Sequence, residues 1–320
     1  MQAIRVHQFG DPSVLKFQEI PTPTPAANQV LIRVRAAGVN PVETYIRTGT
    51  YAIKPQLPYT PGNDAAGTIE SVGQGVTHLS PGERVYTSGS VTGTYAEFTL
   101  CDAIRVHPLP DQVSFAQGAA IGVPYGTAYR AIFQRGNVLP GETVLVHGAT
   151  GGVGIAAIQM LVSIGARVIG TGGTAEGRMM IEGLGAQLAL DHHDATYRET
   201  VMSFTGGEGV DVILEMLANV NLGKDLPMLA RNGRVCVIGS RGPVEINPRD
   251  VMGREADIRG VFYGGAEGKQ YTEVHAWIRA ALTAGALKPI VDREFPLADA
   301  PKAHEQVLAP GSKGKIVLIP

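Results

Sequence analysis

One short stretch restricts the fold of this chain more than any other: a mostly aliphatic run that leads directly into a glycine-rich turn. Residues 143–146 form the run, and residues 147–154 form the turn. A continuous apolar run of this length is typical of a parallel strand buried on both faces. The apolar residues 155–164 then predict a helix, with Gly165 in the position that commonly follows a helix end. Glycines in such a turn let a pyrophosphate approach the backbone at the positive end of the helix, so the segment predicts a nucleotide-binding site.

A glycine-rich turn alone is also compatible with an ordinary connection in an α/β protein, and the flanking strand and helix decide between the two interpretations. Five further strand-like segments follow, separated by helical stretches or turns. They are residues 167–170, 187–190, 210–214, 234–238 and 258–261. With the first strand they make six, the number in a complete dinucleotide-binding sheet. We therefore expect a Rossmann domain with a doubly wound parallel sheet over residues 123–290.

The first third of the chain has a different character. Prolines at positions 21, 23 and 25 exclude a helix there, and short β-rich runs follow at 30–35, 67–73, 84–86 and 102–106. Short strands between glycine and proline turns predict a β-rich domain of the barrel or sandwich type. We place it at residues 1–122 together with 291–320, because 315–319 is one more strand that can return to it. The fold class is α/β.

Composition excludes several functions. The chain has 320 residues, a net charge of -2 and no cluster of Lys or Arg, which argues against nucleic-acid binding. Two isolated cysteines, Cys101 and Cys236, suffice neither for a disulfide framework nor for a multi-cysteine zinc site. No apolar run approaches the roughly 20 residues that span a bilayer, and the first residues resemble a strand rather than a signal peptide. We expect a cytoplasmic protein with no membrane association and no metal.

The end of the second strand of the nucleotide domain indicates which cofactor is bound. Proteins that bind NAD usually carry Asp or Glu there, bonded to the ribose 2′-hydroxyl, and residues 169–174 contain no acid. This absence favours NADPH. Arg178 either faces the 2′-phosphate or is a solvated helix residue, whereas Glu176 could reach a 2′-hydroxyl and argues the other way.

Several longer strings resemble one family. They are residues 38–47, 57–62, 118–122, 144–154, 215–222, 239–242 and 247–250. Across essentially the whole chain they resemble the zeta-crystallin-like quinone oxidoreductases, a zinc-free branch of the medium-chain dehydrogenases/reductases. The zinc alcohol dehydrogenases of that superfamily carry Cys at the place of Asn40 and Gly-His-Glu at the place of residues 62–64. The resemblance implies a GroES-like β-rich domain, NADPH-dependent reduction of a small-molecule quinone without metal, and a homodimer or homotetramer.

The resemblance also implies which residues contact NADPH. They are Tyr45, Thr127, Thr150, Gly151, Gly152, Val153, Gly173, His192, Asn221, Ile238, Gly239, Ser240, Arg241, Val261, Phe262 and Tyr263.

Three residues are candidates for the catalytic site. Asn40 and Tyr45 lie on one short segment and can donate hydrogen bonds to a substrate carbonyl oxygen, and Tyr51 can form a wall for a flat ring. The alternatives are that Asn40 caps a helix and that the tyrosines pack.

Other polar residues carry structural expectations. We expect Asp64 to anchor a loop and His147 to be structural. His192 is placed near the adenine, and His193 is expected to point away from it, as neighbours do in an extended chain.

Two other functions stay open at this point. Reduction of an activated double bond in an alkenal or enone would use the same fold and cofactor, with a tyrosine as proton donor. An NADPH-linked RNA-binding protein is a different class, against which the net charge argues.

Overall fold

The computed structural model describes residues 1–320 and divides into two compact units. The first unit comprises residues 1–123 and 288–320, and the second comprises residues 124–287. The domain boundaries expected from the sequence were 122/123 and 290/291.

The second unit contains a six-stranded sheet whose strands are all parallel, in the order β10-β9-β8-β11-β12-β13. The strands are β8 (Thr143–Val146), β9 (Arg167–Thr171), β10 (Leu188–Leu190), β11 (Val210–Glu215), β12 (Leu229–Val237) and β13 (Asp257–Gly260). In chain order this arrangement is 3-2-1-4-5-6, the order of a dinucleotide-binding sheet. The expected Rossmann domain is therefore confirmed, and all six predicted strands are present.

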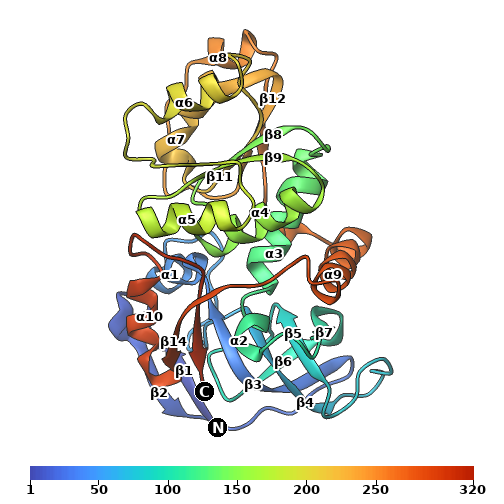
Figure 1. The fold of residues 1–320 in the computed structure, drawn as a ribbon. Coiled ribbons are helices and arrows are strands. Elements are labelled where there is room, and N and C mark those ends of the chain that lie inside the picture. The colour runs from blue at the N-terminus through green and yellow to red at the C-terminus, as the bar shows by residue number, and fades with distance from the viewer. The chain divides into compact units, whose positions relative to one another are not determined.

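Helices cover this sheet on two sides, with α4 and α5 on one side and α6 and α7 on the other (Figure 1). The helices are α3 (Gly122–Tyr129), α4 (Gly152–Ser163), α5 (Ala175–Gly183), α6 (Tyr197–Phe204), α7 (Ala218–Asp225), α8 (Pro248–Met252) and α9 (Gly268–Thr283), and a π-helical segment spans Arg130–Gly136. Helix α4 begins three residues earlier than expected. Gly165 follows its end in the left-handed conformation, at φ +78°.

The first unit is built on a seven-stranded sheet in the order β14-β15-β3-β4-β5-β7, with β6 paired to β3. Its strands are β3 (Gln29–Val39), β4 (Asp64–Val72), β5 (Arg84–Ser88), β6 (Phe98–Asp102), β7 (Val106–Pro108), β14 (Val291–Pro296) and β15 (Lys315–Ile319). Strands β1 (Gln2–Val6) and β2 (Leu15–Glu19) form a separate antiparallel pair, and the helices are α1 (Pro41–Thr48), α2 (Phe115–Gly118) and α10 (Ala300–Gln306).

Two expectations about this unit have clear outcomes. The terminal strand returns to it, because β15 pairs antiparallel with β3 and places Ile316 opposite Val39. The single strand predicted over 102–106 is wrong: a short 3₁₀ turn at Ala103–Arg105 separates β6 from β7. No helix in the structure combines the length and the apolar character that crossing a bilayer requires.

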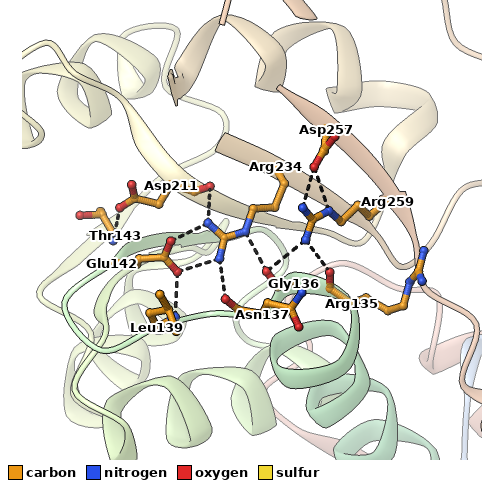
Figure 2. Close-up of polar contacts among 10 residues, drawn as sticks. All are labelled: Arg135, Gly136, Asn137, Leu139, Glu142, Thr143, Asp211, Arg234, Asp257 and Arg259. Atoms are coloured by element: carbon orange, nitrogen blue, oxygen red, sulfur yellow. Dashed lines mark hydrogen bonds and ion pairs between the residues drawn. The ribbon is translucent and has the colours of Figure 1, made fainter. Parts of the chain in front are cut away.

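A buried arginine lies at the end of the sheet where β8 begins (Figure 2). Arg234, on β12, donates from its three guanidinium nitrogens to the carbonyls of Gly136 and Asn137 at 2.8 and 3.0 Å and to both carboxylate oxygens of Glu142 at 2.6 and 2.7 Å. Partial burial alone would raise the pKa of Glu142, but the hydrogen bonds from Arg234 and from the Leu139 amide lower it. The segment that leads into β8 is thereby tied to β12.

Replacing Arg234 by Met removes the guanidinium that donates to both oxygens of Glu142 and to two carbonyls. We expect the free energy of unfolding to fall by about 3 kcal/mol, the lower end of the cost of breaking a buried ion pair from one side, because Glu142 is 21% exposed. Urea unfolding measures it. Arg231→Met is the matched control, because Arg231 forms an exposed pair with Glu255 that contributes less than about 1 kcal/mol. Equal losses in the two variants would contradict this account.

Candidate functional site

The turn between β8 and α4 has the geometry of an anion-binding site. Gly148 adopts φ +57°, and Gly151 precedes the helix without a side-chain cap. A Cβ at Gly154 would lie 2.5 Å from the carbonyl oxygen of Gly148, so only glycine lets the helix pack this closely on the turn. The first N–H groups of a helix have no partner within it, and they attract negative charge. The turn, which includes the predicted residues 150–153, therefore fits a pyrophosphate.

The end of β9 carries no acidic side chain. Thr171, Gly172 and Gly173 lead to Thr174, whose hydroxyl caps α5 by accepting from the Gly177 amide at 3.1 Å. Arg178 donates to the carbonyl of Gly172 and pairs with Asp191 at 2.9 Å. Of the two expectations for Arg178, simple solvation is therefore wrong, because an ion pair holds its guanidinium near the end of β9.

The two neighbouring histidines lie against each other. Their ring centroids are 4.2 Å apart, so the expectation that they point apart is wrong. The reason is Asp191, whose Oδ1 accepts from both the backbone N–H and the ring Nδ1 of His193 and folds the chain into a turn. Burial and the charge of His193 lower the pKa of His192. A Cβ at Gly173 would lie 3.1 Å from His192, so two predicted cofactor residues lie together here.

Two more predicted segments meet at Glu215, the last residue of β11. Its side chain accepts from Asn221 Nδ2 at 3.3 Å and from the Leu217 amide. Its backbone carbonyl accepts from the amides of Ile238 and Gly239 at 2.8 and 3.2 Å. The segment 238–241 and the turn 217–221 are thus held next to each other.

The last predicted segment follows β13 and contacts α3. A Cβ at Gly126 would lie 2.3 Å from the Tyr263 ring, so this ring packs on the helix beside Thr127, which is buried. The Tyr263 hydroxyl is paired with His275 Nε2 at 2.7 Å. Phe262 is 55% exposed and Val261 is half-buried, so a ligand can reach this segment at Phe262.

In the first unit, Asn40 lies in a buried polar cluster. Its Nδ2 donates to Asp64 at 2.9 Å and to Glu43 at 3.2 Å, and its Oδ1 accepts from Lys315. Both amide hydrogens are therefore committed, and Asn40 is only 3% exposed. The expectation that Asn40 donates to a substrate is contradicted. Its backbone N–H also donates to Glu43, so Asn40 starts helix α1, as the capping alternative proposed.

Glu43 completes the cluster. Its oxygens accept from the Tyr95 hydroxyl at 2.6 Å and from the Asn63 amide at 3.1 Å. Burial raises the pKa of Glu43, against the charge of Lys315 and the hydrogen bonds that lower it.

Sequence reasoning missed Lys315, which decides what this cluster can bind. Its Nζ lies 2.9 Å from Asp64, and the Lys315 side chain is 4% exposed. Gly38 makes room for it, because a Cβ there would lie 2.7 Å from Lys315 Cε. Asp64 also accepts from the Val123 amide, so its expected role as an anchor is supported. A fixed ammonium ion-paired with Asp64 repels a divalent cation, and these residues do not fit a zinc ion.

A pocket of about 600 Å³ opens in the same unit. Its walls combine apolar and polar side chains: Arg5, Glu43, Ile46, Ile53, Pro55, Gln56, Pro58, Tyr59, Thr60, Pro61, Gly62, Asn63, Ser90, Val91, Thr92 and Gly93. Neither Asn40 nor the predicted Tyr45 and Tyr51 line it. Tyr45 is on α1 next to Ile46, and its carbonyl accepts from the Tyr51 amide, so the two tyrosines lie beside the pocket-lining part of that helix.

Lys315→Met should lower the free energy of unfolding by about 3–5 kcal/mol, because Asp64 then stays buried without a cation. Adding Asp64→Asn should restore part of that loss, since the double variant has no uncompensated charge. Thermal and urea unfolding measure both. Lys302→Met is the surface control, because Lys302 is 67% exposed in its pair with Asp299. No greater loss in Lys315→Met than in Lys302→Met would refute this role.

Comparison with known proteins gives two family matches. The alcohol dehydrogenase GroES-like domain matches residues 26–111, and the zinc-binding dehydrogenase family matches residues 152–280. The quinone oxidoreductase of Homo sapiens is 47% identical over 100% of this chain and 98% of its own length. Quinone oxidoreductase 1 of Escherichia coli strain K12 is 31% identical over 99% of both chains.

Solved structures show the same similarity. The Escherichia coli quinone oxidoreductase complexed with NADPH has a TM-score of 0.92 at 30% identity and covers 100% of both chains. A mycobacterial protein solved as a complex with NADPH has a TM-score of 0.92 at 32% identity, again over 100% of both chains.

Proposed function

Because the chain belongs to the quinone oxidoreductase family of the medium-chain dehydrogenase/reductase superfamily, we propose that it is an enzyme that reduces quinones with NADPH. The observation that carries the proposal is the glycine turn at 148–154, whose geometry fits a pyrophosphate. The neighbouring strand β9 of the same sheet ends without an acidic residue. The relatives named for quinone reduction span the whole chain, which supports extending their activity to it.

NADPH, when bound, supplies a hydride. The amide groups at the start of α4 would hold its pyrophosphate, and the acid-free end of β9 would accept the 2′-phosphate. Gly173 and His192 lie together at one part of this edge, and Asn221 and the segment 238–241 lie at another. Each group belongs to a loop at the carboxyl end of the parallel strands, where ligands of such sheets bind.

We propose that the quinone binds in the pocket of the first unit. Ile46, Ile53 and Val91 give it apolar walls for a flat ring, and its volume lies in the range of small-molecule sites. Tyr45 remains the proposed donor to a quinone oxygen and Tyr51 the proposed wall for the ring, both from beside the pocket-lining part of α1, with Asn40 reassigned to positioning that helix. The cluster around Lys315 offers no Lewis acid, so positioning and hydrogen bonding activate the quinone.

Oligomeric state and location follow as further parts of the proposal. Strand β13 is the outermost of its sheet, and Ile258 on it is 41% exposed, so we propose a homodimer formed by pairing this edge. Both cysteines are buried and unpaired, as is common in a reducing compartment, and we place the protein in the cytoplasm.

The test of function is NADPH oxidation by the purified protein with ortho- and para-quinones, beside simple enones and alkenals, repeated with NADH. We expect turnover with quinones and preference for NADPH. Turnover with enones alone would assign double-bond reduction instead. Binding of NADPH without turnover of any acceptor would refute the enzymatic proposal.

Gly172→Asp tests the cofactor assignment. A Cβ there would lie 3.1 Å from Ile181 Cδ1 and 3.2 Å from Thr150 Cγ2, both ends of side chains that can shift. A carboxylate at this position repels a 2′-phosphate and can bond a 2′-hydroxyl. We expect the ratio of kcat/KM for NADPH to that for NADH to fall at least about tenfold, a difference of about 1.4 kcal/mol. An unchanged ratio would place the 2′-phosphate elsewhere.

Val91→Trp tests the pocket. Val91 is 52% exposed, so the larger ring can enter the pocket without disturbing the core. We expect the KM for quinone to rise about tenfold while the Kd for NADPH stays unchanged. Ile104→Trp is the control, because Ile104 is 62% exposed and lines no part of the pocket. Equal quinone kinetics in the two variants would exclude this pocket.

A further inference from the structure

Three titratable side chains meet in the interior of the second unit. His147 directly follows β8, Glu215 ends β11 and Asp225 ends α7, and all three are less than 5% exposed. His147 Nε2 lies 2.9 Å from Asp225 Oδ1 and 3.7 Å from Glu215 Oε2. One imidazole nitrogen of His147 and one carboxylate oxygen each of Glu215 and Asp225 lie within 4.8 Å of one another. The cofactor assignments do not use this cluster.

Two buried carboxyl groups face one imidazole in this cluster. Glu215 Oε2 and Asp225 Oδ2 are both buried without a hydrogen-bond partner, and ionisation of both groups would leave one negative charge more than His147 can compensate. A proton held by Glu215 removes that excess and can be shared with Asp225. The cluster is then neutral, with one imidazolium, one carboxylate and one carboxylic acid, which is the arrangement that burial favours.

The shifts in pKa agree with this assignment. Burial first, and then the charge of Asp225, raise the pKa of Glu215 to about 7, although His147 opposes the shift. Burial alone would lower the pKa of His147, but its hydrogen bond to Asp225 and the charges of both carboxyl groups raise it.

The cluster touches each of four loops at the cofactor edge. His147 directly precedes the glycine turn, and its Nδ1 is 3.4 Å from the hydroxyl of Thr171, which precedes the acid-free loop. Glu215 holds the turn 217–221 through its side chain and the segment 238–241 through its carbonyl. A change of charge at Glu215 therefore acts on the backbone that would hold NADPH.

We propose that His147, Glu215 and Asp225 form a proton-sharing clamp that positions the four cofactor loops, and that loss of its shared proton weakens NADPH binding. The effect on NADPH rests on the proposed function. The clamp itself does not, because it consists of contacts within the chain.

Other charged or titratable groups face the clamp. Lys224, on α7, acts on His147 through its charge, and Tyr197, on α6, lies edge-on to His147 with 6.4 Å between ring centroids. The pKa of Tyr197 is raised to about 12 by burial, and that of His192, which senses the charge of His147, is lowered. Tyr197 is thus neutral over the pH range in which Glu215 titrates, and the lowered pKa of His192 favours the neutral form of that ring there. On the neighbouring β12, burial raises the pKa of Cys236 to about 11, so it does not titrate there either.

Glu215→Gln separates the clamp from other causes of pH dependence, because the amide has the shape of the protonated acid and cannot ionise. NADPH binding is measured by fluorescence titration from pH 6 to 9. The 2′-phosphate itself titrates near pH 6, so the readout is the difference between proteins. We expect the wild-type Kd to rise about tenfold more than that of Glu215→Gln between pH 6.5 and 8.5. Glu208→Gln, an exposed control in the same unit, should follow the wild type. Parallel profiles for wild type and Glu215→Gln would overturn the proposal.

Thermal unfolding without cofactor tests the clamp independently of NADPH. A carboxyl group with a raised pKa stabilises the fold fully below its unfolded pKa, and this contribution is lost as pH rises through the folded value. The Tm of the wild type relative to Glu215→Gln should therefore fall between pH 5 and 8, and a constant difference would overturn the clamp. If this difference changes while NADPH binds at no pH, the proposed function fails and the clamp stands.

Two further measurements complete the test. Asp225→Asn removes the carboxylate that faces Glu215, so it should also abolish the additional rise in the Kd for NADPH between pH 6.5 and 8.5. This variant replaces Glu215→Gln if Glu215→Gln does not fold. One equivalent of zinc per chain in the purified protein, absent from Glu215→Gln, would show that these side chains bind a metal in place of the proton.

Discussion

The ion pair between Lys315 and Asp64 is the interaction on which the first unit depends. A buried carboxylate needs a compensating charge, and here the charge comes from a strand that follows Asp64 by about 250 residues. The ammonium links β15 to Asp64 at the start of β4 and to Asn40, which directly follows β3; it fixes the orientation of the Asn40 amide and so holds the start of helix α1. One ion pair thus joins the last strand of the chain to the helix that carries Tyr45 and part of the pocket.

The same pair determines the chemistry available to this unit. In the zinc alcohol dehydrogenases of the same superfamily, Cys stands at the place of Asn40 and Gly-His-Glu at the place of residues 62–64. Here the positive charge is a lysine whose hydrogen bonds are used within the protein, so it polarises no acceptor from outside. Quinones accept electrons readily, and a reaction with them can proceed by positioning alone. The second unit meets the same cost of burying charge in another way, by sharing a proton among His147, Glu215 and Asp225.

Local patterns predicted much of the fold and part of the site. The aliphatic run at 143–146 and the glycine turn after it identified the nucleotide domain, because a buried parallel strand and a close phosphate approach both leave a signature over a few consecutive residues. The acid-free end of β9 could be predicted in the same way. What failed depended on contacts that no short window contains: Asn40 looked free to donate until Lys315 and Asp64 were placed around it. Asp191 likewise turned the chain so that His192 and His193 lie together rather than apart.

The central claim is that this chain reduces quinones with NADPH and without metal. The most direct measurement is the rate of NADPH-dependent quinone reduction before and after exhaustive dialysis against a zinc chelator, with the metal content of each sample determined by mass spectrometry. We expect the same kcat in both samples and far less than one zinc per chain. Loss of activity on chelation, restored by one equivalent of zinc, would contradict it.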